Sequence, residues 1–137
     1  MGSMADDDAR DIGPHRVWIE PPDVLRTQIR GDITVEHVMA LLDVIDGFPP
    51  RVRVYILRDA RQTGVPTREA REALVKNLPV ERVAAVVTYG ASFQVRAILM
   101  MLSHAMRVLR PSHPRFVFVE TEADARAFLQ AVSARRA

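Results

Sequence analysis

Cysteine is absent from this 137-residue chain, and long apolar runs are absent as well. Without cysteine the chain has no disulfides, thiolate metal sites or cysteine nucleophiles. The longest apolar run, 97–102, is much shorter than the roughly 20 residues that a membrane helix requires. No apolar segment follows the N-terminal methionine, so a signal peptide is not expected. These absences predict a cytoplasmic protein without a transmembrane segment.

Motifs of the common active sites are also missing. The sequence has no GxGxxG, P-loop or GxSxG motif, and its histidines do not have the spacing of metal ligands. Acidic pairs such as Asp43 and Asp46 have no companion nucleophile or base. We therefore expect no enzymatic activity, no catalytic residue, no metal and no cofactor.

The chain has little excess charge of either sign. Its 19 Lys and Arg residues are nearly balanced by 17 Asp and Glu residues, which leaves a net charge of +2. Basic and acidic residues alternate, as in the Arg-Glu-Ala-Arg-Glu segment 68–72, and this pattern is typical of a solvated helix face. A nucleic-acid partner is not expected.

The composition that is present is that of one globular domain. About half of the residues are hydrophobic (48%) and 26% are charged, at a length that buries a sizeable core. Residues 1–13 are small, acidic and without periodicity, and 1–3 have the character of a cloning remnant. We expect a flexible tail over 1–13 and a single domain over 14–137.

Hydrophobic periodicity predicts an α/β fold with the order β-β-α-β-α-β-α-β-α. The opening hairpin has to be antiparallel, and the later alternation with helices indicates parallel strands. The sequence thus predicts a mostly parallel five-stranded sheet. Its expected strands are 17–20, 24–29, 52–57, 83–88 and 116–119, and its helices follow the caps Asp32 or Thr34, Thr67, Ser92 and Thr121.

Three of the strands alternate between apolar and polar residues, which predicts one wet face. We expect the helices mainly on the other face. We expect the Trp18 ring on the wet face beside Arg26 and Arg53, where it could stack on a guanidinium. The side chains predicted on the wet face are Trp18, Arg26, Gln28, Arg53 and Tyr55.

This element order, with Asp59 closing the third strand, the apolar run 83–87 and the closing block 115–129, resembles the small bacterial SpoIIAA-like proteins. They are relatives of STAS domains, and their fold is shared in part with CRAL-TRIO lipid-binding proteins. The resemblance covers residues 15–133. It implies a regulatory domain that binds a protein partner, as anti-sigma-factor antagonists do. The alternative is a small apolar or lipid-like ligand in a groove near the third helix.

The same resemblance implies a phosphorylation site. In STAS antagonists, a partner kinase phosphorylates a serine or threonine at the start of the second helix, within a sequence close to Asp-Ser-Ser-Gly. Thr67 has that place here, although the surrounding residues are Val65, Pro66 and Arg68. We predict that any regulatory phosphorylation falls on Thr67, and the alternative is that Thr67 is only a helix cap.

The helix 92–109 carries more apolar residues than one packed face needs. A core stripe of Val95, Ile98, Leu102, Ala105 and Leu109 leaves other apolar residues over. We expect the surplus to form a surface for a partner, including a second copy in a homodimer, or to line a groove for an apolar molecule. Burial by two neighbouring elements is the alternative. The residues proposed for this surface are Phe93, Met100, Met101 and Met106.

Asp59 and Thr88 end consecutive parallel strands, where open α/β sheets bind ligands. We therefore add both residues to the candidate surface. The alternative for Asp59 is that its carboxylate caps the loop before Thr63.

Overall fold

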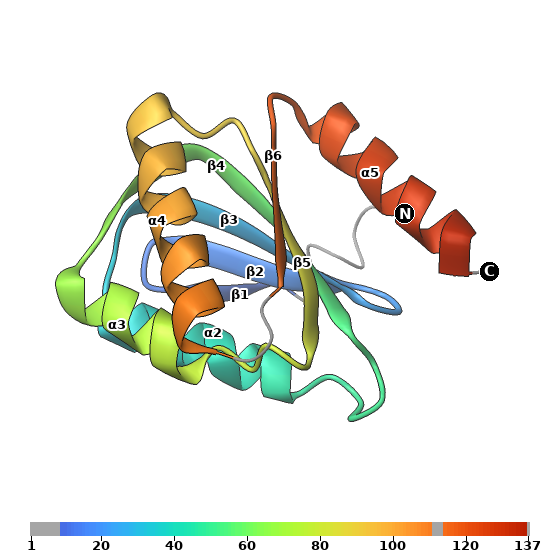
Figure 1. The fold of residues 1–137 in the computed structure, drawn as a ribbon, viewed down its shortest axis with the longest axis horizontal. Coiled ribbons are helices and arrows are strands. Elements are labelled where there is room, and N and C mark those ends of the chain that lie inside the picture. The colour runs from blue at the N-terminus through green and yellow to red at the C-terminus, as the bar shows by residue number, and fades with distance from the viewer. Residues whose placement is uncertain (1–8, 111–113, 137) are drawn as a thin grey trace.

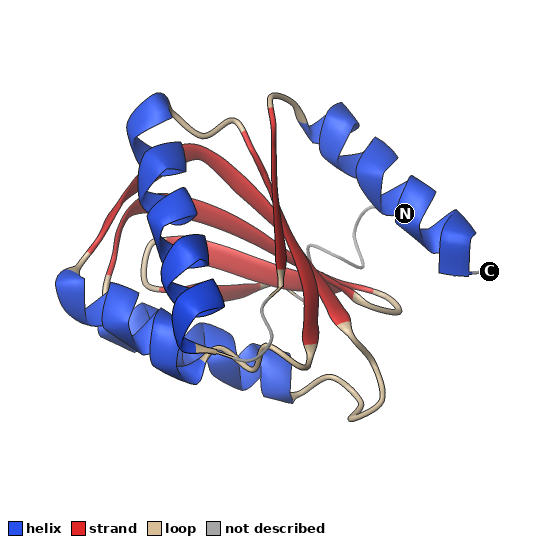
Figure 2. Cartoon of the chain, viewed as in Figure 1, coloured by secondary structure: helices blue, strands red, loops and turns tan. Residues whose placement is uncertain are grey.

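A computed structural model describes residues 9–110 and 114–136 of the chain and shows one sheet with helices on both of its faces (Figures 1 and 2). No helix in these residues is long and apolar enough to cross a membrane. In chain order the elements are β1 (Arg10–Ile12), β2 (His15–Glu20), β3 (Val24–Ile33), α2 (Val35–Asp46), β4 (Val54–Pro66), α3 (Arg68–Asn77), β5 (Val83–Tyr89), α4 (Phe93–Leu109), β6 (Arg115–Val119) and α5 (Glu122–Arg136).

The six strands lie in the sheet in the order in which they occur in the chain. β1, β2 and β3 pair antiparallel, whereas β3, β4, β5 and β6 pair parallel. The predicted α/β class, the opening hairpin and the mostly parallel sheet are therefore confirmed.

The sheet has one strand more than the sequence indicated. β1 pairs with β2 through a tight turn at Gly13, whose positive φ of 59° favours glycine, and Ile12 is buried in the core. The expectation of a flexible tail is therefore wrong for residues 10–12. Three residues are too few for a detectable hydrophobic period, and residues 1–8 lie outside the described part of the chain.

The strand order explains where the helices lie. Because the order never reverses, right-handed crossovers place α2, α3 and α4 on the same face of the sheet. α5 follows the last strand and is free of this constraint, and it lies on the opposite face (Figure 1). Most helices share one face, as predicted.

α5 creates a second core that the sequence did not indicate. Tyr55 and Leu57 of β4 and Val87 of β5 are buried against it, and the half-buried Phe128 and Leu129 of α5 pack on them. Tyr55 is only 8% exposed, so its predicted place on a wet face is wrong. The error arises because a tyrosine between apolar residues in a strand fits a solvated face and a half-polar core equally well.

Local capping signals predicted the helix starts correctly. The hydroxyls of Thr34, Thr67 and Ser92 each accept a hydrogen bond from the backbone of the third residue that follows. Asp32, the other candidate cap for α2, instead accepts a hydrogen bond from the Val65 backbone N–H. This bond ties the end of β3 to the end of β4.

Candidate functional site

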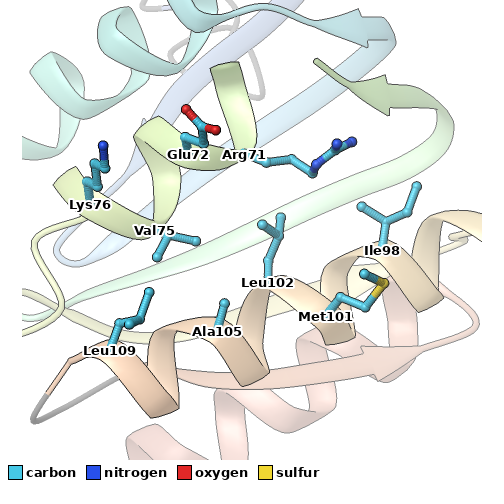
Figure 3. A pocket seen from close by; sticks show the side chains of 9 residues that line it. All are labelled: Arg71, Glu72, Val75, Lys76, Ile98, Met101, Leu102, Ala105 and Leu109. Carbon is cyan, nitrogen blue, oxygen red and sulfur yellow. The ribbon is translucent and has the colours of Figure 1, made fainter. Parts of the chain in front are cut away.

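A groove of about 510 Å³ lies between α3 and α4, with side chains of the two helices facing each other across it (Figure 3). The residues that form the α4 side are apolar, whereas those on the α3 side are mostly charged. Its lining comprises Arg71, Glu72, Val75 and Lys76 of α3, and Ile98, Met101, Leu102, Ala105 and Leu109 of α4.

The positions of apolar residues around the axis of α4 explain why its side of the groove is apolar. Val95, Leu99, Leu102 and Met106 are buried at helical spacing and attach α4 to the protein. A neighbouring row that includes Ile98, Ala105 and Leu109 faces the groove instead. The buried side of α4 is therefore rotated around the helix axis relative to the prediction. Because α4 is apolar around most of its circumference, its sequence allows more than one choice of buried side.

Met106 is the clearest correction on this helix. Its side chain is 1% exposed and belongs to the core, so it cannot contribute to a surface. By contrast, Phe93 is 88%, Met100 57% and Met101 71% exposed, which confirms their surface position. Their role in binding stays a prediction.

The exposed apolar side chains are concentrated on this one helix. Of the eight large hydrophobic residues that are exposed in the described part of the chain, five belong to α4. Scattered exposed apolar residues are normal, but a cluster is typical of an interaction site. The five are Phe93, Met100, Met101, Val108 and Leu109.

The charges around the groove are mainly basic. α3 contributes Arg71 and Lys76 to the groove. α4 contains no acidic residue, and its Arg96 and Arg107 lie on the other side of the helix, where Arg107 lines a hollow beside Phe116 and Phe118. The acidic Glu72 of the groove accepts a hydrogen bond from Arg68 at 3.3 Å. An apolar surface with a basic border fits a partner that is apolar and acidic.

Asp59 and Thr88 do not form a shared site. Arg58 pairs with Thr88 and Asp59 with Tyr89, so Asp59 and Thr88 are one register position apart and point to opposite faces of the sheet. Both are buried, at 4% and 1% exposure. The prediction that they belong to a ligand or partner surface is therefore wrong. A sheet whose strand order never reverses also lacks the crevice that makes strand ends a binding site.

The Asp59 carboxylate accepts hydrogen bonds from Arg61, two positions later in the chain. Arg61 donates to it from its backbone N–H and from its guanidinium, with Nη2 at 2.7 Å from Oδ2. Burial raises the pKa of Asp59, but these bonds and the charge of Arg61 outweigh burial and hold the pKa below its ordinary value. The carboxylate therefore pairs locally within β4, and the loop that it was expected to cap does not form, because β4 continues through Thr63.

A second polar network joins α5 to the sheet. Arg26 of β3 donates to Glu122 at 2.8 Å and to the Tyr89 hydroxyl at 2.7 Å. Its guanidinium also lies 5.2 Å from the Trp18 ring, as predicted for Arg26, whereas Arg53 donates to the Val83 carbonyl. The hydrogen bond from Arg26 is the main reason why the pKa of Glu122 is lowered, and Arg126 of α5 pairs with Glu20 in β2. This network holds α5 against the sheet.

A third polar cluster consists of His15, His37 and Arg58 and lies on the face of the sheet that α2, α3 and α4 cover. The sequence analysis did not predict this cluster. His15 is 2% exposed, and its Nδ1 accepts from the Arg30 backbone N–H at 3.0 Å. Its Nε2 therefore carries the proton and lies 3.1 Å from both the Asp32 carbonyl and His37 Nδ1. Burial first, and then the charge of His37, lower the pKa of His15 below its ordinary 6.5.

This pKa shift predicts a stability that depends on pH. The folded state disfavours the protonated form of His15, so the unfolded chain takes up the proton first as the pH falls below 6.5. We expect the wild-type melting temperature to fall more between pH 7 and pH 5 than that of His15→Gln, which has no imidazole. Thermal unfolding at both pH values measures this, and parallel pH profiles of the two proteins would contradict it.

Comparison with known proteins supports the fold. No protein-family model matches the chain, and no curated protein matches its sequence. Among solved structures, it is similar to an uncharacterized DUF3478-family protein from Shewanella loihica PV-4, which is described as having a SpoIIAA-like fold. The TM-score is 0.58 and the identity 16%, over 88% of this chain and 97% of the other. The chain has a SpoIIAA-like fold.

Within this SpoIIAA-like fold, Thr67 is the N-cap of α3 and accepts a hydrogen bond from the Ala70 backbone N–H at 3.1 Å. Arg71, one turn later, donates to the Pro66 carbonyl and also lines the groove. Thr67 thus lies where the sequence placed it, at the end of α3 that carries Arg71. Its phosphorylation stays a prediction.

Proposed function

We propose that the chain is a non-catalytic interaction domain that binds an amphipathic helix of a partner protein along α4. The observation that carries this proposal is the exposed apolar surface of α4, which continues into the groove beside α3. Laying the apolar face of a helix into an apolar groove is a common mode of peptide recognition. The SpoIIAA-like fold is compatible with this role, since the resemblance implies a domain that binds proteins.

The extent of the apolar surface favours a helix over a small molecule. α4 has 17 residues and is therefore roughly 25 Å long, and its exposed apolar side chains occur from Phe93 to Leu109. A small apolar ligand is the second candidate, because a volume of about 510 Å³ lies in the usual range of ligand pockets. Such a ligand would leave Val108, which does not line the groove, uncovered.

The charges favour a different protein over a second copy of this chain. Two copies that met through α4 would place against each other two helices that carry arginines and no acidic residue. A partner helix with acidic residues beside its apolar face would match this border.

A model peptide tests the proposal. The probe is a fluorescent amphipathic helix of about five turns, with leucines on one face and glutamates on either side of it. We expect the wild-type chain to bind it, and Met101→Glu to weaken binding at least about tenfold, because a carboxylate would be buried against leucine. Fluorescence anisotropy measures the Kd. Met39→Glu is the matched control, since Met39 is 46% exposed on α2 and away from the groove.

Further variants distinguish a partner helix from a small apolar ligand and from a second copy of the chain. Val108→Glu is expected to weaken binding of the helix, whereas it would leave a small ligand in the groove untouched. A peptide with lysines in place of the glutamates is expected to bind more weakly than the acidic one. Equal binding by wild type and Met101→Glu would contradict the proposal. A wild-type chain that is dimeric by light scattering and monomeric as Met101→Glu would identify a second copy as the occupant.

A further inference from the structure

The two edge strands of the sheet differ in how well they are protected against pairing with another chain. β1 forms one edge and has three residues, of which Arg10 and Asp11 are charged and exposed. Short length and charged side chains are common devices that keep a sheet edge from pairing. β6 forms the other edge and consists of Arg115 followed by Phe-Val-Phe-Val. These four apolar residues of high strand propensity leave the edge at β6 without such protection.

The backbone of β6 has unpaired hydrogen-bonding groups along this edge. The Gly90 N–H donates to the Val119 carbonyl at 3.3 Å, so the backbone of Val119, and that of Val117 two positions earlier, points toward β5. The N–H and C=O groups of Phe116 and Phe118, at the alternate positions, therefore point to the outer edge. No strand in the described part of the chain pairs with them. An added strand would satisfy these groups.

A hollow of about 280 Å³ lies beside this edge, between α4 and β6. Side chains of an added strand that lie opposite Phe116 and Phe118 would point to the same face of the sheet, which is the face of the hollow. The volume lies just below the roughly 300–1,000 Å³ of small-molecule pockets, so the hollow fits side chains of a paired strand better than a separate ligand. Its lining consists of Phe116 and Phe118 of β6 and Met100, Ser103, His104 and Arg107 of α4.

The two ends of the hollow differ in character. Phe118 packs against the buried cluster of α4 that ends at Leu102, whereas Phe116 packs against the cluster that contains Met106, next to Arg107. No described residue that lines the hollow is acidic, and no described carboxylate pairs with Arg107. The end at Phe118 therefore fits an aliphatic side chain, and the end at Phe116 fits a carboxylate.

We propose that β6 binds an extended, acidic segment of a partner protein as an additional antiparallel strand. Antiparallel pairs are the more common and the slightly more stable arrangement. In this orientation, an aliphatic residue of the segment lies opposite Phe118, and an acidic residue two positions later lies opposite Phe116. Charge disfavours a second copy of this chain, whose β6 contains Arg115 and no acidic residue. The hollow and the groove share no lining residue, so the inference is independent of the proposed function.

A short peptide tests this strand edge. The probe is a fluorescent peptide with the sequence Gly-Thr-Val-Thr-Glu-Thr-Gly, and fluorescence anisotropy measures its Kd. We expect the wild-type chain to bind it. N-methylation of the valine or of the glutamate, whose N–H groups would face β6, should weaken binding at least about tenfold. N-methylation of the threonine between them is the matched control, because its N–H would point away from β6, and this peptide should bind like the unmodified one.

Charge reversal tests the basic end of the hollow. Arg107→Glu should weaken binding of the peptide at least about tenfold, and lysine in place of the glutamate of the peptide should restore much of it. Met101→Glu is the matched variant on the same helix, since Met101 is exposed but lines the groove and not the hollow. It should bind this peptide as the wild type does, which separates the strand edge from the groove.

Amide hydrogen exchange in the wild-type protein locates the contact without a variant. The amides of Phe116 and Phe118 should exchange more slowly once the peptide is bound, whereas the Val117 amide, which faces β5, should change little. Absence of peptide binding would overturn the proposal, as would equal binding of the peptides methylated at the valine and at the threonine. A wild-type chain that is dimeric by light scattering, with protected Phe116 and Phe118 amides and no peptide binding, would identify a second copy as the occupant instead.

Discussion

Met106→Ala is expected to lower the free energy of unfolding by about 3 kcal/mol, whereas Met101→Ala should change it by less than about 0.5 kcal/mol. Both methionines belong to α4, and the two substitutions remove the same atoms. Met106 is 1% exposed and packs into the core beneath the helices, so its loss leaves a cavity. Met101 is 71% exposed, so its loss removes mainly atoms that water already contacts.

Urea unfolding followed by circular dichroism measures both effects. Equal losses of stability in the two variants would contradict the assignment of Met101 to the surface and Met106 to the core. The comparison also supports the groove experiment, because it shows separately that changes at position 101 leave the fold intact.

Arg26→Met is expected to lower the free energy of unfolding by about 2 kcal/mol and to loosen α5. Removing the guanidinium leaves Tyr89, which is 1% exposed, without the donor to its hydroxyl, and it leaves Glu122 without its main partner. Hydrogen bonds to charged groups contribute about 1.5–3 kcal/mol each. The Glu122 side chain is 43% exposed, so water replaces part of this interaction and the expected loss lies in the lower part of that range.

The local effect distinguishes a structural network from a general loss of stability. Amide hydrogen exchange should accelerate in α5 more than in α2, since Arg26 contacts Glu122 and not α2. Arg30→Met is the matched control, because Arg30 lies on the same strand and its guanidinium donates to Gln28 at an exposed position. Similar exchange in α5 for both variants would show that the network does not hold this helix.

Local sequence signals predicted the helices and strands correctly. Features that depend on contacts between distant parts of the chain were not predicted. The caps Thr34, Thr67 and Ser92 and the alternation in β3 depend on neighbours within a few residues, so the sequence contains them. The position of α5 depends on contacts between Phe128 and Leu129 and residues of β4 and β5 far away in sequence. No local pattern indicates which face of the sheet such a helix covers, and the second core was therefore missed.

The candidate site was predicted in part for the same reason. The surface position of Phe93, Met100 and Met101 was predicted by counting the apolar positions on one helix. Which side of that helix is buried depends on the elements that pack against it, and the sequence of the helix alone does not show this. The position of Arg58 could have been predicted from the sequence. Val54, Ile56 and Arg58 occupy alternate positions of one strand, so an arginine follows two apolar residues that point to the core.

The consecutive strand order has a consequence for how the chain folds as it is synthesised. Each strand pairs with the one made just before it, so no strand has to be inserted between two that are already paired. Pairing consecutive strands keeps each loop as short as the crossover helices allow, which limits the loop-closure entropy of each step. The growing sheet can extend one strand at a time from its N-terminal edge. β6 and α5 complete it last, and until α5 docks, the apolar face that includes Leu57 and Val87 stays uncovered.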